Sequence, residues 1–534
     1  MLRKTKTVVA VVASTALMMT GCSSAGTTTG SAGTADYAID GTFTASMVSD
    51  PGSLSPLMTA SSDARRVLDY MYDRLAFADP ATGVLHPWLA TAWTEAPSEV
   101  TFTMKPGVTC SDGSALTAQT VADNFNFVAN KANNSPLRGV FVPADGTATA
   151  DLATGIVTLK TPEPSPFMLA NATSLNIICD AGIKDPKAAD AASIGSGLFK
   201  LKDVAANDHY TLERRAGYDW APDGKTTSET PGVPATVIFK VVPNESTSAN
   251  LLLSGGLNMA TINGPDQARV QAANLTTVPI ERGIGQMYFN QLAGKATADP
   301  AVRIALTAGL DLDNVTKVMT AGKGTRTKQL STIAPVACTM TTTGALPGFD
   351  AAGAAKDLDK AGWKLGGDGK RSKDGKDLKL TLLYEILDDT TTAAAEYAQQ
   401  QWAKLGVTIV LQGGDSNTVG TKLLSGADNG GWDISWEPIL MSTPSPIVSY
   451  LSGPAPAEGT NFGSMKNPSY EAAVQKASAL VGEPACAAWG EAEKALYATA
   501  DVVPFASTTV SVFLSKASLA FEKTFFGPSI RLLK

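Results

Sequence analysis

A strand–helix–strand pattern in residues 378–411 constrains the fold of this chain more than any other local feature. Residues 378–382 alternate apolar and polar side chains, as a half-buried strand does. A helix is predicted over 391–405, because apolar side chains recur there at helical spacing, at Ala395, Ala398, Trp402 and Leu405. Gly406 ends this helix, and the β-branched run 407–411 follows it. Such a unit joins neighbouring parallel strands, so the sequence predicts an α/β fold with a parallel or mixed sheet.

Other segments add strands and helices of the same class. Residues 101–104 alternate as a strand, and Thr117 can cap a helix over 118–130. Pro468 favours the start of another helix, whose apolar face would contain Val474, Ala477 and Val481. The chain shows no repeat of fixed period, so a single α/β architecture is expected.

The charge of the chain argues against a nucleic-acid partner. Without residues 1–21, which contain three basic residues and no acidic one, the chain carries 40 basic and 50 acidic side chains and a net charge of −10. Affinity for nucleic acid depends on neutralising phosphates with basic side chains. The one dense basic run, 370–376, contains an Asp374-Gly375 turn and is interpreted as a solvated hairpin.

The amino terminus has the layout of a secretory signal. Arg3, Lys4 and Lys6 precede an apolar run over 8–19, and small residues lead to Cys22. The terminal cysteine makes this segment resemble a bacterial lipoprotein signal. That resemblance implies removal of signal peptide 1–21 and lipidation of Cys22. An ordinary signal peptide with a chance cysteine is the alternative.

Residues 22–36 are expected to form the lipidated cysteine and a flexible tether, because 23–36 contains no large apolar side chain. No later apolar stretch approaches the roughly 18 residues needed to span a bilayer. We therefore expect the body of the protein to be lipid-anchored at the outer face of the cytoplasmic membrane, on the periplasmic side or at the cell surface.

The chain lacks the residue patterns of common enzymes. His86 and His209 are its only histidines, and no H-E-x-x-H, G-x-S-x-G or Walker-type sequence is present. The acidic pairs Asp388-Asp389 and Asp311/Asp313 could act without histidine, but helix capping or surface roles fit them better. We expect no catalytic residues, no cofactor and no metal site, since the cysteines of an exported chain are better used in disulfides.

A series of short segments occurs in an order that is informative as a whole. The most specific is Phe102–Val108 followed by Ser111–Ala118, which combines a strand, a turn and a helix cap. The other segments are Leu54-Ser55-Pro56-Leu57, Tyr72-Asp73-Arg74-Leu75, 83–93, 253–258, 290–311 and 355–363. Together they resemble the extracytoplasmic solute-binding proteins of ABC transporters, in the oligopeptide-, dipeptide- and nickel-binding family (family 5). The resemblance spans about residues 40–510.

This resemblance implies a two-lobed fold of the type II periplasmic-binding-protein kind, with an extra subdomain and a ligand cleft between the lobes. The first lobe would be discontinuous and comprise 37–75, 191–283 and 501–534. The family-specific subdomain would occupy 76–190, and the second lobe 284–500.

Four cysteines remain after Cys22, and they allow three pairings. We predict disulfides Cys110–Cys179 and Cys338–Cys486, because each pair lies within one of the implied domains. Free buried thiols are the alternative.

The resemblance places the ligand beside the aromatic-rich segment 432–444. Trp432 and Trp436 could stack on a ligand or could belong to the core, and Glu437 could offer a carboxylate. In peptide-binding relatives an aspartate of this segment pairs with the peptide amine. The corresponding position here falls near Ser442, which is uncharged.

A loop of the first lobe would face that segment. Ser61 and Ser62 could offer hydroxyl and backbone hydrogen bonds from it. Nickel binding is not expected, because the chain has only two histidines.

The resemblance implies a receptor that closes its lobes over a small ligand, an oligopeptide in the first instance, and delivers it to the membrane permease of an ABC importer. An alternative within the family is a sugar, an opine or another metabolite as ligand. Alternatives of a different class are an extracellular hydrolase and a surface adhesion or sensing protein. We expect a monomer that contacts the membrane through its lipid alone.

Overall fold

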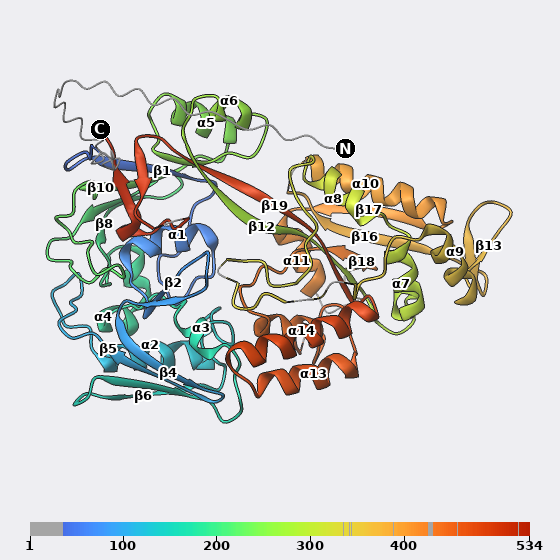
Figure 1. Cartoon of the computed structure of the whole chain (residues 1–534), viewed down its shortest axis with the longest axis horizontal. Helices are drawn as coiled ribbons and strands as arrows, with labels where there is room; N and C mark the ends of the chain where they lie inside the picture. Colours follow the sequence, from blue (N-terminus) through green and yellow to red (C-terminus); the bar gives the residue numbers. More distant parts are fainter. Residues whose placement is uncertain are drawn as a thin grey trace, which may run out of the picture. The chain divides into compact units, whose positions relative to one another are not determined.

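Two long antiparallel strands, β12 (Thr276–Phe289) and β19 (Val502–Leu514), form the middle of the largest sheet. In this computed structural model the described residues are 36–534 except 335, 341, 343, 388, 425–430, 457 and 522, with the backbone alone for 62, 416, 417 and 483. Figure 1 shows β12 and β19 crossing from the elements near α5 to those near β16. These two strands therefore connect the two halves of the sheet.

The sheet has ten strands in the order β17-β16-β18-β12-β19-β11-β1-β10-β9-β8. On one side of the central pair lie β17 (Thr408–Gly414), β16 (Lys379–Glu385) and β18 (Ile434–Trp436). On the other side lie β11 (Met259–Thr261), β1 (Thr42–Met47), β10 (Thr236–Val241), β9 (His209–Arg214) and β8 (Phe199–Ala205). Parallel and antiparallel neighbours both occur, so the sheet is mixed.

The strand–helix–strand unit predicted for 378–411 is present. Strands β16 and β17 pair in parallel, and α10 (Asp389–Lys404) connects them. The helix turns its small and aromatic side chains to the core, namely Ala394, Ala395, Ala398 and Trp402. Gly406 has a φ of +80°, which suits the residue that ends the helix.

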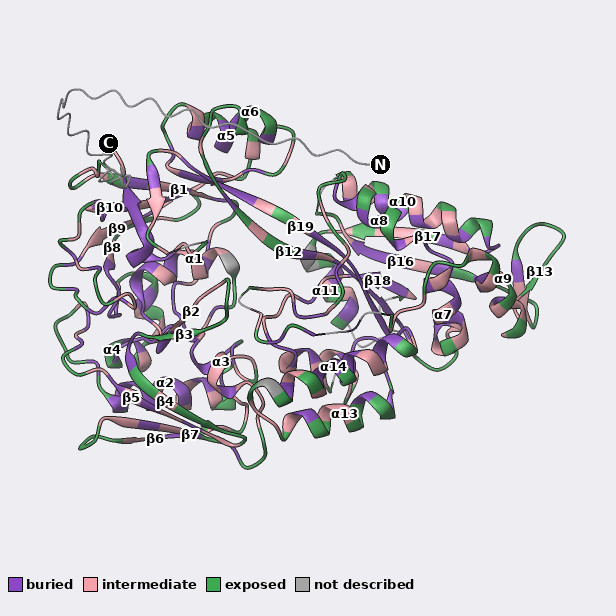
Figure 2. Ribbon diagram, in the orientation of Figure 1, coloured by how far each residue is buried: buried purple, intermediate pink, exposed green. Residues whose placement is uncertain are grey.

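Side chains of β16 and β18 alternate between two cores, one on each face of the sheet. One face carries Leu382 and Trp436 into a cluster with α7 (Pro300–Ala308), α8 (Leu312–Met319) and α9 (Ala351–Lys360). The other face carries Leu383 into a cluster with α11 (Ser416–Leu424), α13 (Pro468–Ser478) and α14 (Gly482–Ala498). Figure 2 shows buried residues along these strands and exposed residues on the outer sides of the helices.

A separate antiparallel sheet has the order β4-β5-β7-β6. Its strands are β4 (Ala90–Ala96), β5 (Glu99–Met104), β7 (Ile156–Lys160) and β6 (Thr147–Asp151). Helix α2 (Ala118–Ala129) packs on β6 and β7 and begins with the capping box that Thr117 was predicted to start. This sheet shares one continuous hydrophobic core with β1, β9 and β10, through residues such as Phe102 and Phe43.

Shorter elements complete the described part of the chain. The helices are α1 (Ser62–Met71), α3 (Met168–Ala172), α4 (Asp180–Lys184), α5 (Glu245–Leu253), α6 (Gln267–Gln271) and α12 (Val448–Leu451). The strands are β2 (Ala76–Ala78), β3 (Leu85–Pro87), β13 (Lys364–Leu365), β14 (Arg371–Lys373), β15 (Lys376–Asp377), β20 (Ala517–Leu519) and β21 (Ile530–Leu532). Strands β14 and β15 form the hairpin predicted at Asp374-Gly375, and both turn residues have positive φ angles.

Glycines mark the point where β12 passes from one half of the sheet to the other. The register with β19 shifts between Gly283 and Gln286. A Cβ atom at Gly285 would lie 2.6 Å from the Phe505 ring and 2.7 Å from Ala506 Cβ. Only glycine therefore fits at position 285 without displacing β19.

One helix boundary differs from the expectation. Val481 was expected on the same helix face as Val474 and Ala477, but α13 ends at Ser478. Val481 instead has an extended backbone and comes directly before α14, whose first residue, Gly482, has a φ of +67°. The spacing of the apolar residues continued past the end of the helix and was misleading.

The four cysteines form disulfides Cys110–Cys179 and Cys338–Cys486, the two pairs expected from the sequence. The two cysteines lie 69 residues apart in the sequence in the first disulfide and 148 residues apart in the second. Segment 1–21 and Cys22 lie outside the described residues. Within the described part of the chain, no helix has the length and apolar character required to cross a bilayer.

Candidate ligand-binding cavity

A cavity of about 940 Å³ lies beside β12 and β19, lined there by Ile280 and Val512. The rest of its described lining comes from segments far apart in the sequence: β1, α1, residues 74–88 with β2 and β3, β4, residues 167–174 with α3, β10, β11, residues 333–334 and 337–339 of the 333–339 loop, 442–443, 480–482 and 485–486 at the start of α14, and 523–526. Ligand pockets are usually about 300–1,000 Å³. The cavity is therefore large enough for a small organic molecule or a short peptide.

Helix α1 presents charged side chains to this cavity. Its apolar side, with Val67 and Leu68, is buried in the core, which leaves Arg66 and Asp69 to line the cavity. Arg74, three residues beyond the helix, forms an ion pair with Asp69 and also lines the cavity. We call Arg66, Asp69 and Arg74 the α1 wall.

Next to the α1 wall the lining is aromatic. Phe77, Trp88, Phe239 and Phe526 all line the cavity, and we call them the aromatic floor. The ring centroids of Phe77 and Trp88 lie 5.4 and 5.3 Å from that of Phe526. Tyr70, which also lines the cavity, packs edge-on against Phe239 at 5.0 Å. Close ring contacts of this kind hold the floor in place. Trp88, Phe239 and Phe526 are only 3%, 1% and 5% exposed, so the half-buried Phe77 offers most of the aromatic area that a ligand could reach.

The opposite wall is built on a disulfide. Cys338 and Cys486 line the cavity, so their bond ties loop 333–339 to the first turns of α14. The loop is also hydrogen-bonded to the neighbouring segment, since Ala337 N–H donates to the Ser442 carbonyl at 2.9 Å and Ile333 N–H to that of Met441 at 3.1 Å. This wall contributes no charged side chain among the described lining residues.

Direct contacts close one end of the cavity between α3 and the 443–445 segment. The Thr443 hydroxyl donates to Asn171 Oδ1 at 3.1 Å, and the Ser445 hydroxyl donates to the Pro166 carbonyl at 3.3 Å. A neutral hydrogen bond contributes about 1 kcal/mol net. These contacts are weak enough to separate if the cavity opens to admit a ligand.

A buried carboxylate lies in the core behind the floor. Asp73 is 1% exposed and accepts hydrogen bonds from Trp220 Nε1 at 2.8 Å and the Ser196 hydroxyl at 2.9 Å. Burial raises the pKa of Asp73 to about 6, although these hydrogen bonds and the charge of Arg215 oppose the rise. The role of Asp73 is to join strands and loops in this core.

Glu437 lies directly after β18, next to Glu385 at the end of the parallel strand β16. Burial, and then the neighbouring charge of Glu385, raises the pKa of Glu437 to about 8. Its Oε2 atom is buried and has no hydrogen-bond partner in the described part of the chain. At neutral pH this side chain mostly keeps its proton and can donate a hydrogen bond rather than offer a full negative charge.

The structure brings only part of the predicted site together. Ser442 lines the cavity, whereas Trp432, Trp436, Glu437 and Ser61 are not among its lining residues. Trp432 and Trp436 are 0% and 3% exposed and pack against Phe462 and Phe505 in the core.

Ser61 lies at the start of α1 and caps it, with its hydroxyl accepting from the Ala64 N–H at 3.4 Å. The side chain of Ser62 lies outside the described residues. Ligand contact by the six predicted residues stays a prediction.

Sequence reasoning missed the α1 wall and the aromatic floor. Arg74 and Trp88 were noted only as parts of family-like segments. The sequence offered one signal for the α1 wall, namely the two arginines 65 and 66 followed by Asp69 in helix α1 of an acidic chain. Such a pattern does not by itself indicate a ligand. The floor joins residues up to 449 positions apart, from Phe77 to Phe526, so no local pattern could have found it.

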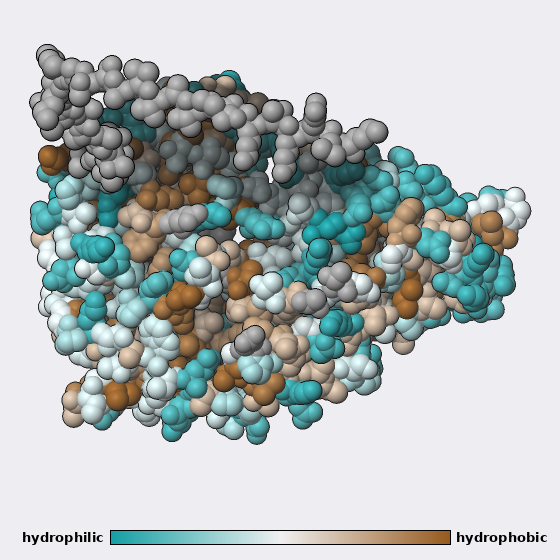
Figure 3. Space-filling view, in the orientation of Figure 1, coloured by the Kyte–Doolittle hydropathy of each residue, from teal (hydrophilic) through white to brown (hydrophobic). Residues whose placement is uncertain are grey.

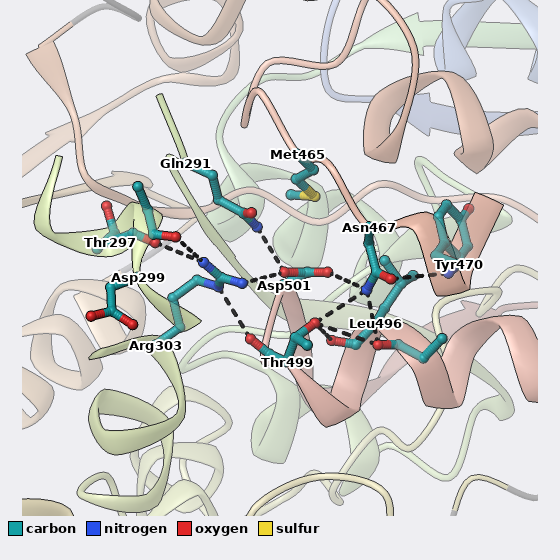
Figure 4. A network of polar contacts seen from close by, with 12 residues as sticks. Gln291, Thr297, Asp299, Arg303, Met465, Asn467, Tyr470, Leu496, Thr499 and Asp501 are labelled. Carbon is teal, nitrogen blue, oxygen red and sulfur yellow. Dashed lines mark hydrogen bonds and ion pairs between the residues drawn. The ribbon is translucent and has the colours of Figure 1, made fainter. Parts of the chain in front are cut away.

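A second buried polar network lies outside the cavity lining (Figure 4). Arg303 of α7 and Asp501, just before β19, form an ion pair at 2.7 Å with side chains 4% and 2% exposed. Asp501 also accepts from Gln291 Nε2 at 2.8 Å and Asn467 Nδ2 at 2.7 Å. Arg303 donates further to the backbone carbonyls of 297, 298 and 499. The network is fully hydrogen-bonded, which indicates a structural role.

The described residues contain no group of three His, Cys, Asp or Glu side chains placed to hold a metal ion. His86 stacks on Phe77 with ring centroids 6.0 Å apart, and His209 is hydrogen-bonded to Asp203 and Asp208.

In Figure 3, apolar residues on the visible face occur in scattered patches among polar ones.

Two known proteins have similar sequences over half or more of this chain. The chain is 27% identical over 385 residues to Protein XP55 of Streptomyces lividans, covering 69% of this chain and 66% of that protein. It is 27% identical over 279 residues to the glutathione-binding protein GsiB of Pectobacterium atrosepticum, covering 51% of this chain and 52% of that protein. The alignments thus span between half and two thirds of these relatives.

A solved structure has a similar fold over nearly the whole chain. It is a substrate binding protein from Microbacterium hydrocarbonoxydans complexed with 4-hydroxybenzoate hydrazide, with 25% identity and a TM-score of 0.71 over 92% of this chain and 99% of that one. The sequence profile of the bacterial extracellular solute-binding proteins, family 5 Middle, matches residues 84–458. The predicted α/β binding-protein fold is confirmed, and the chain belongs to the family 5 bacterial extracellular solute-binding proteins.

Proposed function

We propose that this protein is an extracytoplasmic receptor that encloses a small solute, an oligopeptide in the first instance, and delivers it to an ABC importer. The observation that carries the proposal is the cavity of about 940 Å³ beside the two strands that join the halves of the main sheet. A ligand enclosed there would contact both walls. It would therefore favour the closed arrangement by the difference in its affinity for the two states.

Two further findings support a binding role rather than a catalytic one. The matching family is one of solute-binding proteins, and a relative binds glutathione, which is a tripeptide. The lining of the cavity is more apolar than polar, as in pockets that bind small organic ligands.

The test is native mass spectrometry of the protein purified without refolding, repeated after denaturation. The account expects a mass excess in the native spectrum that disappears on denaturation and is recovered as a small molecule or a ladder of short peptides. An empty protein that also shows no thermal shift with peptides, sugars or aromatic acids would contradict a receptor role.

A second ligand class has its own support. Phe77 of the aromatic floor presents a half-buried ring to the cavity, and the similar protein from Microbacterium hydrocarbonoxydans was crystallised with an aromatic hydrazide. Ser442, which lines the cavity, offers no charge for a peptide amine. A small aromatic metabolite in the released material would favour this class over peptides.

The remaining features follow as parts of the same proposal. Signal peptide 1–21, lipid on Cys22 and tether 22–36 would hold a monomeric receptor at the outer face of the membrane, close to its permease. The intact mass of the mature protein tests the anchor. A diacylated Cys22 as first residue is expected, and an unmodified amino terminus would contradict it.

The lobe boundaries and the ligand role of the 432–444 segment belong to the proposal as well. Residues 37–75, 191–283 and 501–534 would form the first lobe, with 76–190 as its subdomain and 284–500 as the second lobe. The continuous core between the subdomain and the first lobe supports treating these two as one moving body.

A further inference from the structure

The charged residues that line the cavity are unevenly distributed. The basic ones are Arg66, Arg74 and Lys523, and the acidic ones are Asp69 and Glu95. None of them comes from loop 333–339, residues 442–443 or the start of α14 among the described lining residues. The balance of charge is therefore decided by the partners that these five side chains already have.

One carboxylate oxygen of Asp69, Oδ1, is engaged by the protein. It forms the ion pair with Arg74 and accepts a second hydrogen bond from Asn176 Nδ2 at 3.1 Å. The Nε–H of Arg74 is buried and has no acceptor among the described residues, so a ligand could reach only the other N–H groups of this side chain, which is 27% exposed. Both hydrogen bonds to Asp69 go to its Oδ1 atom, and this side chain is 21% exposed.

Arg66 has no comparable partner. Its shortest ion-pair distance is 3.9 Å, to Asp63 Oδ1, and its side chain is 42% exposed. Asp63 also accepts through its Oδ2 atom from the Ser49 backbone N–H at 3.2 Å and from the Ser49 hydroxyl at 2.7 Å, so Arg66 shares this carboxylate with Ser49. The guanidinium of Arg66 is thus only loosely paired and is exposed enough to bind a second carboxylate.

A third arginine adds positive charge behind the wall. The Arg65 guanidinium lies 4.6 Å above the Phe141 ring and donates to the Ser174 carbonyl at 3.2 Å. Burial, and then the charge of Arg74, lowers the pKa of Arg65 to about 10, so it stays protonated at neutral pH. Three basic side chains, Arg66, Arg74 and Lys523, line the cavity against two acidic ones, Asp69 and Glu95, so its lining carries a small excess of positive charge although the protein as a whole is acidic.

We infer that the α1 wall receives an anionic group of the ligand, a carboxylate in the first instance, through the exposed N–H groups of Arg66 and Arg74. The aromatic floor beside it receives an apolar part of the same ligand. The inference rests on the proposed receptor function and specifies the ligand class: an amphipathic molecule with a carboxylate at one end, such as a peptide with a free carboxyl terminus.

The test compares matched acids and amides by isothermal titration calorimetry on the full mature protein. The probes are the pentapeptide Ala-Leu-Phe-Leu-Ala as acid and as carboxyl-terminal amide, and 4-hydroxybenzoate against 4-hydroxybenzamide. We expect at least one acid to bind tenfold or more tightly than its amide. Arg66→Gln should weaken that acid at least fivefold and leave the amide unchanged.

The control is Arg269→Gln on α6. This arginine is exposed to a similar degree, 46%, has an acidic partner at i−3, and does not line the cavity. Arg269→Gln removes the same charge as Arg66→Gln and should change the affinity for neither the acid nor the amide. Equal weakening by both variants would overturn the inference by showing a general effect of net charge.

The outcomes separate this inference from the proposed function. Binding of acid and amide with equal affinity would overturn the anionic wall and leave the receptor role standing. Binding of no probe, together with no co-purified ligand, would count against both. Release of a co-purified ligand without an acidic group would overturn the inference alone.

Discussion

At the scale of single residues, the buried Arg303–Asp501 ion pair gives the clearest prediction about stability. Removing one partner leaves the other charge buried without compensation, which usually costs about 3–5 kcal/mol. Arg303→Met should therefore lower the free energy of unfolding by about that amount, because Asp501 is only 1% exposed. Urea unfolding followed by circular dichroism measures the loss.

The matched control is the exposed pair of Arg269 and Asp266, whose side chains are 46% and 21% exposed. Arg269→Met should cost at most about 1 kcal/mol. Similar losses in the two variants would show that burial does not set the cost here.

The buried carboxyl group of Glu493 should make the stability of the protein depend on pH. It is 3% exposed, and burial raises its pKa from an ordinary value of 4.5 to about 7. Between these values the folded protein keeps a proton that the unfolded chain has lost, so the free energy of unfolding falls as the pH rises from about 4.5 to 7. The full contribution is on the order of 3 kcal/mol.

Glu493→Gln should flatten this part of the stability curve, because the amide does not ionise. Thermal unfolding between pH 4.5 and 8 provides the measurement. Glu491→Gln, on the exposed side of the same helix, should leave the slope as it is. An unchanged slope in Glu493→Gln would mean that other carboxyls, such as Asp73, dominate this pH range.

At the scale of elements, the two disulfides should have different effects. Both close long loops, and the chain-entropy model gives each about 4–5 kcal/mol. Only Cys338–Cys486 lines the cavity. Replacing both of its cysteines by serine should lower ligand affinity as well as stability, whereas the same change at Cys110–Cys179 should lower stability alone. Calorimetry with the co-purified ligand decides, and equal affinity in the two variants would contradict this assignment.

Local elements could be predicted from the sequence because their signals are local. The periodicity of Ala395, Ala398 and Trp402 located α10, and Thr117 located the start of α2. The pairing of β12 with β19 could not be predicted, since it joins positions such as Thr276 and Leu514. Partners so far apart leave no trace in local spacing.

The site was less predictable than the fold for the same reason. Trp436 has the aromatic character of a ligand contact, but its place on β18 buries it against Phe505. Arg66 is an ordinary helix-surface residue in the sequence, and only the packing of α1 brings it to the cavity. Residue type indicates what a side chain can bind, whereas tertiary structure decides whether a ligand can reach it.

At the scale of the whole molecule, β12 and β19 connect the two halves of the main sheet and line the candidate cavity. The glycine-marked irregularity in β12 lies in this connection. A change in twist there would move the disulfide-bonded wall relative to α1 with little repacking of the two cores on the faces of β16 and β18. The account therefore expects the ligand to hold the walls together and its departure to let them separate.

The most direct test of this account is a crystal structure of the protein with its co-purified ligand or with the acid probe that binds most tightly. The account predicts ligand density between the α1 wall and loop 333–339, with an acidic group within hydrogen-bonding distance of Arg66 or Arg74. Density elsewhere, for example beside Glu437 with the cavity empty, would contradict it.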